Sequence, residues 1–538
     1  MPDAFYDTEL LKLYKGKEVR LEFKSNRFLH LKSWGPKLYE KLIMSKKEDK
    51  LFGHTPSFQV GGQRMGSTNE HLFSMITVMR RLERERVGGG IVFMDIRSCF
   101  DQVRLNDILF EGTQCGIVGR PLRAIQEYTD NLRIRMRGDP NPDRCALLSN
   151  TTGQGSSFAP VGTSMVMART LANNIDGSDH KEKLEILGTV KGLELKPNFF
   201  VDDLAKPCQT VHELKATGKV ITKTLNELSL SAHPEKSGIL IFGGAKEKLE
   251  AEIITEQPQV QGFNLAIKGE ETYLGMIFSS LGASDSIMKT LINRRAKCMS
   301  KAGEIKRKLA DERMMGVGWL AAASTIFSSV IVSTLTYGAA AMTGMNAAHW
   351  DLLEMIQRQS LIHVLDISHK CTYKSLLYVM GILPAADVVK KLQICFVNNL
   401  IHIKEGGQCL ETILKDEKIG GIKGLLGEVR EYCLQYGLPD VTKQYVPAEV
   451  IKNQITRKVL DNLWVSHLVA KKPPAMIRRD DLTLRFYSNL PKNKAKLALS
   501  LDVGELNFRR NRKYEAMKKY GSISCLKMKG AENSTDLC

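Results

Sequence analysis

Paired cysteines are missing from this sequence. Its 538 residues include 11 cysteines, an odd number, and no two of them form a C-x-x-C pair. Disulfide frameworks and zinc ribbons depend on such pairing and spacing, so neither is indicated. We expect a protein of a reducing compartment that has no zinc site.

Long uninterrupted apolar runs are also missing. The N-terminal stretch has no apolar core behind a basic start, so a secretory signal is not indicated. Residues 314–348 carry no charged side chain, but Ser and Thr residues between 324 and 336 interrupt the apolar run. We therefore expect a buried helix pair there, no membrane partner, and an intracellular location in the nucleus, the cytoplasm or both.

Acidic residues are too few to balance the basic ones. Lys and Arg number 77 and Asp and Glu 59, which gives a formal net charge of +18. Such an excess favours a polyanionic partner, because binding to a polyanion releases its condensed counterions. Charge alone does not decide between nucleic acid and an anionic membrane. The apolar share of 43% and the charged share of 25% are ordinary for a globular protein.

One acidic residue stands at the end of a buried strand. Residues 68–86 have the apolar spacing of a helix that Thr68 or Asn69 could cap, and the three glycines at 88–90 are expected to stop it. The run 91–94 then predicts a buried strand that ends at Asp95. This order of helix, break and strand indicates an α/β layout that delivers a carboxylate at a strand end.

Two further acidic residues follow a second strand. Residues 195–201 have strand character and end at Asp202 and Asp203, while a helix is expected over about 211–230 and a third strand over 238–242. Adjacent residues of a strand face opposite ways, so both aspartates reach one site only if they occupy a hairpin turn. Two divalent metals about 4 Å apart need carboxylate oxygens from such positions. The alternative for an isolated Asp-Asp pair is a solvated turn.

Six short motifs in a fixed order give these carboxylates a context. The sequence around Asp95 (FMDIRSCFDQV, 93–103) resembles the first palm motif of the reverse transcriptases of LINE-type (non-long-terminal-repeat) retrotransposons. Five further segments resemble other motifs of that group. They are QVGGQRMGST (59–68) for the finger motif, GQGSSFAP (153–160) for the Gln-Gly motif, FVDD (200–203) for the aromatic-x-Asp-Asp motif, LSAHPEKS (230–237) for the lysine motif and YLG (273–275) for the primer grip. Any one of them is weak evidence, and their joint order carries the resemblance.

The resemblance implies an α/β (α+β) right-hand polymerase. We expect fingers over residues 1–90, a palm with an interleaved fingers segment over 91–283, a helical thumb over 284–400, and a helical, basic C-terminal extension over 401–538. It implies RNA-directed DNA polymerase activity, with an RNA template, a DNA primer and dNTPs as partners. The expected cofactors are two ions of Mg²⁺ or Mn²⁺.

The resemblance also assigns roles to single residues. Asp95, Asp202 and the backbone carbonyl of Ile96 would bind the metals, with Asp203 in support, and Lys236 would protonate the leaving pyrophosphate. Phe100 would lie under the incoming sugar and exclude a 2′-hydroxyl. The remaining candidates are contacts to the dNTP from Gln154, Gly155 and Arg27, and a primer grip formed by Tyr273, Leu274 and Gly275.

Two other functions compete with this hypothesis. An RNA-dependent RNA polymerase would carry a small or polar residue in place of Phe100. A decayed or domesticated, non-catalytic remnant would bind RNA through its net positive charge alone. The intact carboxylates and Lys236 argue against decay.

Overall fold

The structure is a computed structural model, and it describes residues 6–14, 26–63, 66–137, 146–147, 156, 158–190, 193–310, 319–367, 369, 371–403, 409, 411 and 424–470. The chain divides into two compact units. Unit 1 comprises Met1–Ser286 and Gly406–Gly420, and unit 2 comprises Ile287–Glu405 and Gly421–Cys538. Helices and sheets are mixed, as the sequence predicts, and helices are in the majority among the described residues.

A five-stranded sheet forms the centre of unit 1. Its order is β13-β10-β3-β9-β8, with β3 in the middle and antiparallel to both neighbours. The strands are β3 (Gly88–Met94), β8 (Asn198–Phe200), β9 (Asp203–Cys208), β10 (Gly238–Gly243) and β13 (Ile267–Lys268). The expected strands at 91–94 and 238–242 are therefore present, whereas the strand expected over 195–201 is limited to Asn198–Phe200.

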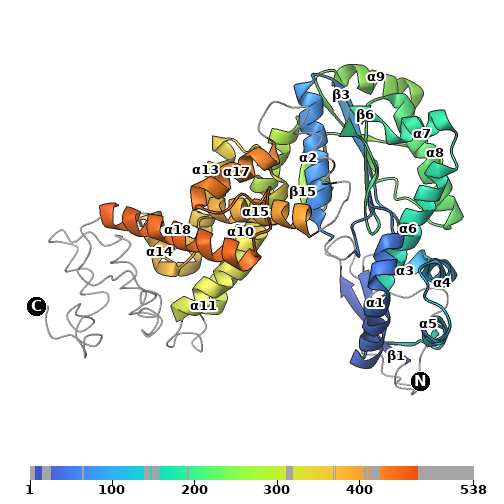
Figure 1. Cartoon of the computed structure of the whole chain (residues 1–538), viewed down its shortest axis with the longest axis horizontal. Coiled ribbons are helices and arrows are strands. Elements are labelled where there is room, and N and C mark those ends of the chain that lie inside the picture. Colours follow the sequence, from blue (N-terminus) through green and yellow to red (C-terminus); the bar gives the residue numbers. More distant parts are fainter. Residues whose placement is uncertain are drawn as a thin grey trace, which may run out of the picture. The chain divides into compact units, whose positions relative to one another are not determined.

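The two faces of this sheet are covered by different helices (Figure 1). On one face Val92 and Met94 belong to the core that also contains apolar residues of α6 (Ala159–Asp176) and α8 (Val211–Glu227). Helix α2 (Thr68–Arg84) contacts β3, β8 and β10. Since side chains alternate along a strand, Ile91, Phe93 and Asp95 face away from α6 and α8. Asp95 thus points to the side of the sheet where Phe93 meets the rings of Tyr273 and Phe278.

The N-cap of helix α2 lies one residue before the expected caps. Ser67 is the N-cap, and a capping box joins it to Glu70: the Ser67 side chain accepts a backbone hydrogen bond while the Glu70 carboxylate accepts one from Ser67 N. The prediction of a cap at Thr68 or Asn69 is therefore wrong, because the Ser-x-x-Glu spacing satisfies more backbone donors.

The three glycines after α2 do not form a break between elements. The helix has already ended at Arg84, and Gly88–Gly90 are the first residues of β3. An added Cβ at Gly89 would lie 2.5 Å from Cδ1 of Leu82 in α2. The glycines therefore allow β3 to pass close to its neighbours, and the expectation that they serve as a stop is wrong.

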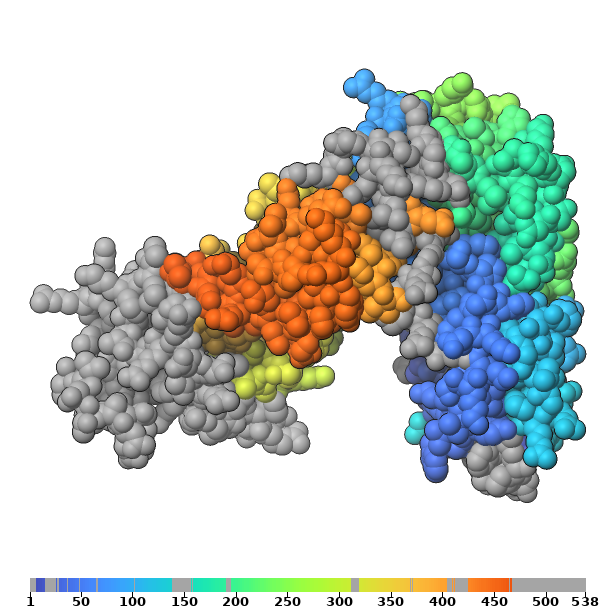
Figure 2. Space-filling model, in the orientation of Figure 1, coloured from blue at the N-terminus to red at the C-terminus, as the bar shows by residue number. Residues whose placement is uncertain are grey.

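A smaller sheet in unit 1 has the order β2-β1-β4-β5. It consists of β1 (Asp7–Tyr14), β2 (Asn26–Lys32), β4 (Arg133–Met136) and β5 (Ala146–Leu147), and it is accompanied by α1 (Trp34–His54), α4 (Leu105–Gln114) and α5 (Arg120–Asp130). A hydrogen bond between the side chains of His54 and Glu111, at 2.7 Å, joins α1 to α4. The two segments lie side by side on the surface, in blue and cyan in Figure 2.

A buried ion pair links this sheet to Ser156 of the Gln-Gly motif. Lys32 Nζ lies 3.0 Å from Glu40 Oε1, and the hydroxyl of Ser156 donates to the same oxygen at 2.9 Å. Both members of the pair are buried. A buried charge is stable only when it is paired and hydrogen-bonded, so this contact fixes Ser156 against β2 and α1.

Unit 2 is helical in its described part. Its helices include most of α10 (Ala283–Leu309) and then α11 (Trp319–Ile326), α12 (Ser333–Thr336), α13 (Ala347–Leu365), α14 (Tyr373–Met380), α15 (Ala385–His402), α17 (Leu425–Tyr436) and α18 (Ala448–Ala470). A π-helical segment, Phe327–Val332, joins α11 to α12. The helix pair expected over 314–348 is therefore one interrupted helix followed by the 3₁₀ turn Ala339–Ala341, at least from Trp319 onward.

One helix in the described part of the chain could cross a membrane by its length and composition. This segment is Trp319–Ala341, and half of its most apolar window is buried inside the protein. A core helix passes the same test, so the segment alone is weak evidence for a membrane span.

Candidate active site

Asp95 is held at the end of the central strand by backbone pairing. Its N–H donates to the Ser237 hydroxyl at 3.2 Å, and its C=O accepts from His233 N at 2.8 Å. Arg97 N donates to Ser231 O at 2.9 Å, so Ile96 lies opposite Ala232 in a short antiparallel bridge. In this pattern the peptide groups of Ile96 point away from Ala232. The backbone carbonyl of Ile96 is therefore not used by this bridge.

Asp202 and Asp203 occupy the hairpin turn that the sequence argument requires. Phe200 of β8 pairs with Asp203 of β9, which leaves Val201 and Asp202 as the two-residue loop between the strands. Val201 has φ +63°, in the left-handed region that a β-branched residue rarely adopts. A positive φ at the first loop position belongs to the turns that match the twist of a hairpin. The turn thus brings both carboxylates to the strand end beside Asp95, since Met94 pairs with Leu204.

The charges of the three carboxylates act on one another. Burial, followed by the charges of Asp202 and Asp95, raises the pKa of Asp203 from its ordinary value of 3.8 to about 7. The ammonium group of Lys236 acts in the opposite direction. The side chains are therefore close enough to form one electrostatic unit, and a positive charge placed among them would relieve their repulsion.

Lys236 supplies one positive charge to this unit. Its Nζ lies 3.0 Å from Asp95 Oδ2, and its backbone N–H donates to His233 O at 3.1 Å. The pair is well exposed, so its contribution to stability is small. Its value is positional, because it places a proton-bearing group directly beside the strand-end carboxylate.

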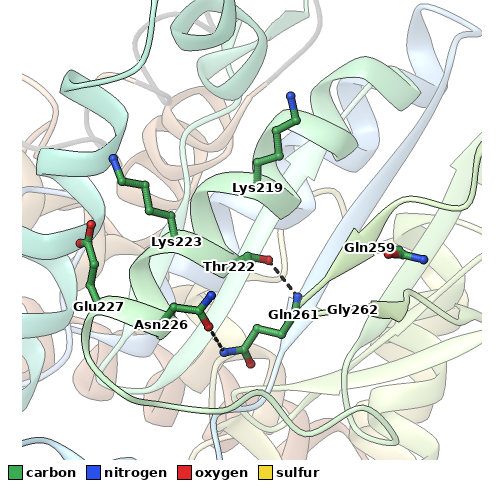
Figure 3. A pocket seen from close by; sticks show the side chains of 8 residues that line it. All are labelled: Lys219, Thr222, Lys223, Asn226, Glu227, Gln259, Gln261 and Gly262. Atoms are coloured by element: carbon green, nitrogen blue, oxygen red, sulfur yellow. Dashed lines mark hydrogen bonds between the residues drawn. The ribbon is translucent and has the colours of Figure 1, made fainter.

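Gln261 holds the loop that carries Lys236. Its Oε1 accepts from Ala232 N and its Nε2 donates to Leu230 O, both at 2.9 Å. Figure 3 shows the other side of this contact, where Gln261 bonds to Thr222 and Asn226 of α8. These residues line an open pocket of about 550 Å³ together with Lys219, Lys223, Glu227, Gln259 and Gly262. The loop 230–237 is thus fixed to α8 on one side and to Asp95 on the other.

The carboxylates suit a divalent cation in their chemistry, although they are not arranged as its ligands. Among the described residues, no group of three or more His, Cys, Asp or Glu side chains is placed so that it could hold a metal ion. The carboxylate of Asp95 is paired with Lys236 instead. Carboxylate oxygens are nevertheless the donors that Mg²⁺ and Mn²⁺ prefer. Desolvation is the main cause of the raised pKa of Asp203, and the charges of Asp202 and Asp95 add repulsion that a cation would relieve.

Phe100 lies close to Asp95 along the chain. It is half-buried in the short helix α3 (Cys99–Gln102), directly after Ser98, whose φ is +43°. Left-handed Ser98 turns the chain sharply between the strand end and this helix. Phe100 thus lies in the short helix that follows the strand end, while its role towards a sugar stays a prediction.

The expected primer grip is only partly at the surface. Leu274 and Gly275 have φ values of +46° and +79° and form the turn between β14 (Glu270–Tyr273) and β15 (Met276–Ser279). The ring of Tyr273 is buried, and its hydroxyl donates to Asn198 O at 3.3 Å. Burial also raises the pKa of Tyr273. A primer could therefore meet Leu274 and Gly275 of this motif, whereas Tyr273 anchors the hairpin in the core.

Three other predicted residues are not fully described. Gln154 and Gly155 lie outside the described residues. Arg27 lies in β2 opposite Leu13, and its side chain is outside them too. Their contacts with a dNTP stay predictions.

The structure adds residues that the sequence did not single out for a role. Gln59 belongs to the finger motif, yet its side chain bonds to Val201 beside the aspartates. Ser237 ends the lysine motif and binds Asp95 N, and Gln261 lies outside every motif. The partners of these residues are 29 to 142 positions away in the sequence, so no local pattern reveals them.

Comparison with known proteins gives a family for this part of the chain. No curated protein sequence matches. Among solved structures, apo telomerase from Candida tropicalis matches with 11% identity and a TM-score of 0.41, over 84% of this chain and 68% of that one. A form of it truncated from the C-terminal domain matches with 12% identity and a TM-score of 0.36, over 52% of this chain and 54% of that one. Telomerase from Candida albicans, in complex with a fragment of telomeric RNA, matches with 11% identity and a TM-score of 0.38, over 84% and 65%.

The family model that matches is described as reverse transcriptase (RNA-dependent DNA polymerase), and it covers residues 16–278. This range contains Asp95, the Asp202–Asp203 turn, Lys236 and the hairpin at Leu274. The expected right-hand polymerase fold is the fold of that family. Residues 16–278 of the chain are therefore similar to the reverse transcriptase family.

Proposed function

We propose that this chain is an RNA-directed DNA polymerase of a LINE-type retrotransposon, which adds dNTPs to a primer 3′-hydroxyl on an RNA template. The observation that carries the proposal is that the β8–β9 turn places Asp202 and Asp203 at the strand end beside Asp95, within the residues that match the reverse transcriptase family. The LINE assignment is supported by the finger motif at 59–68 and by the order of the six motifs.

The residues that would bind two Mg²⁺ or Mn²⁺ ions are Asp95, Asp202 and the carbonyl of Ile96, with Asp203 in support. Bound divalent ions lower the barrier to phosphoryl transfer by neutralising charge that develops on the reacting oxygens. The chain's own task is then to hold the carboxylates close together in spite of their repulsion, which the pairing of β3 with β9 and the β8–β9 turn accomplish. Nearly all of the catalysis would come from positioning and charge.

Two further side chains would act on the nucleotide. Lys236 would give a proton to the leaving pyrophosphate, as its place beside Asp95 allows. Phe100 would close the space at the 2′ position of the sugar and so favour dNTPs. Gln154, Gly155 and Arg27 are the proposed further contacts to the dNTP, and Leu274 with Gly275 the proposed contact to the primer. In this proposal unit 1 supplies fingers and palm, and unit 2 the thumb and the C-terminal extension.

Extension of an oligo(dT) primer on poly(rA), with Mg²⁺ or Mn²⁺, tests the proposal. We expect dTTP incorporation that stops when the metal is chelated and when Asp202→Asn is introduced. A wild-type chain that binds the template yet never extends the primer would favour the non-catalytic remnant. Incorporation of UTP as readily as dTTP would favour an RNA polymerase.

A further inference from the structure

The side chain of Gln59 lies beside the turn that carries two of the aspartates. Its backbone forms a parallel bridge with Phe199, and Val60 N donates to Phe199 O at 3.1 Å. The segment around Gln59 therefore runs along the outer edge of β8. Gln59 itself is 1% exposed, so its amide group has to find all of its partners within the protein.

The amide of Gln59 uses its full hydrogen-bonding capacity. Its Oε1 accepts from Val201 N and from Gly61 N, both at 2.9 Å. Its Nε2 donates to Val201 O at 3.3 Å and to Ser164 O at 3.4 Å. A primary amide offers two lone pairs and two N–H groups, so this orientation satisfies all four. Both backbone polar groups of Val201 are thus bonded to one side chain.

Val201 is the residue of the turn that most needs such support. Its φ of +63° is unfavourable for a β-branched residue, and conformations of this kind persist only where the surroundings hold them. The close approach of the finger motif provides those surroundings. A Cβ added to Gly61 would lie 2.4 Å from Val201 N, so a glycine is required there for the two segments to meet.

We propose that Gln59 is a positioning residue of the active site: it clamps the Val201 peptide groups and so fixes Asp202 and Asp203 relative to Asp95. The inference rests on the proposed polymerase function for its catalytic consequence. Gln59 touches neither substrate nor the reacting atoms, and it acts through the geometry of the turn. A shift of about 1 Å in a catalytic group can reduce a rate by about 10²-fold.

The first test removes the hydrogen bonds and keeps the volume. Gln59→Met should lower kcat for primer extension by roughly 10- to 100-fold, while the KM for dTTP changes by less than about threefold. Mn²⁺ binding to the complex of enzyme and primer–template, measured by electron paramagnetic resonance, should weaken as well. Gln59→Glu retains the two acceptor contacts, but its second carboxylate oxygen would face the carbonyls of Val201 and Ser164, so it should lower kcat at least as much as Gln59→Met.

The second test moves the turn and leaves Gln59 unchanged. Gly61→Ala should reproduce the loss of Mn²⁺ affinity and of kcat, because its methyl group would displace Val201. Gly53→Ala is the matched control, since nothing lies within 4 Å of the added Cβ. Gln357→Met is the second control, because Gln357 is a buried glutamine in unit 2 that bonds to Leu383 O and Ala385 N. Neither control should change Mn²⁺ binding.

Hydrogen exchange tests, independently of activity, whether Gln59 holds the turn at Val201. Peptides that cover residues 199–204 should exchange at least tenfold faster in Gln59→Met than in the wild type, and at wild-type rates in Gln357→Met. Unchanged exchange there would overturn the clamp, and so would faster exchange combined with unchanged Mn²⁺ binding and kcat. A wild-type chain without any primer extension would instead refute the proposed function, and the exchange and Mn²⁺ measurements would still judge Gln59.

Discussion

The two places where carboxylates leave the central sheet are built in different ways. Asp95 directly follows β3 and is held by a short antiparallel bridge to residues 231–233, and a lysine on the adjoining loop neutralises it. Asp202 and Asp203 lie at a two-residue turn whose first residue has a left-handed backbone and depends on Gln59. The first position is stable by ordinary secondary structure, whereas the second is strained and is held from outside.

The electrostatics follow the same division. The charge of Asp95 has a nearby counter-ion in Lys236. Asp203 is half-buried, and desolvation together with the charges of Asp202 and Asp95 raises its pKa to about 7. Strain and unrelieved charge therefore coincide at the turn, which is the pattern of a site whose geometry is kept for function at some cost in stability.

The largest loss of activity should come from removing the carboxylate charge at the strand end or at the turn. Asp202→Asn and Asp95→Asn each remove a carboxylate charge with little change of shape, so each should lower kcat on oligo(dT)·poly(rA) by at least about 10³-fold. Primer–template affinity, measured by filter binding, should stay within about threefold. If either variant retained more than a few per cent of the activity, that aspartate would not belong to the metal site. The strand end and the turn would then not be equally required for catalysis.

The next effect tests what the lysine contributes at the strand end. Lys236→Met should lower kcat by about 10²-fold, since the protonated group beside Asp95 is lost. Lys236→Arg keeps the positive charge, but a guanidinium does not release its proton near neutral pH, so most of the loss should remain. Lys248→Met alters an exposed lysine of α9 (Lys246–Glu256) and serves as the control. Full activity of Lys236→Arg would reduce the lysine to a counter-ion.

A smaller effect concerns Phe100, which follows the strand end. Phe100→Val should make room at the sugar and raise the relative kcat/KM for rNTP over dNTP by roughly tenfold. Single-nucleotide incorporation of UTP and dTTP on poly(rA) measures this ratio. Phe110→Val, at an exposed position of α4, should leave it unchanged. An unchanged ratio in Phe100→Val would remove this residue from the sugar site.

The sequence predicts the strand-end position better than the turn. Apolar runs and periodicity locate β3, α8 and β10, and the alternation of strand side chains already requires Asp202 and Asp203 to occupy a hairpin. These features depend on neighbours along the chain. The bonds between Gln59 and Val201 join residues 142 positions apart, and nothing local in either segment indicates them.

Two errors have the same physical origin. The glycines at 88–90 are consistent with a helix stop, but they are explained by the close approach of Ala245, Leu82 and Ile239, respectively, which only the packed structure reveals. The apolar stretch before residue 348 suggests two helices, whereas its hydroxyl side chains bond to backbone carbonyls of the preceding turn, as Thr334 does with Val330 O, within a helix that continues through a π segment. Tertiary contacts decide both cases.

The smallest expected effect sharpens the electrostatic difference between the two places. The folded-state pKa of Asp203 is raised to about 7 from an ordinary 3.8, so the folded state resists ionising this group. The resulting destabilisation is absent below about pH 3.8, grows as the pH rises towards 7, and is complete above it. In buffer with a chelator, Asp203→Asn should therefore raise the melting temperature by roughly 2 °C at pH 8 and by almost nothing at pH 4.5.

Asp107→Asn, which breaks an ion pair with Arg104 on α4, should show no such trend over this range. Differential scanning calorimetry across pH 4.5–8 measures the melting temperatures of both variants. Added Mn²⁺ should stabilise the wild type more than Asp203→Asn, and so should reduce the difference in melting temperature between them. A gap that did not depend on pH would mean that Asp203 ionises normally and that the turn carries strain without charge.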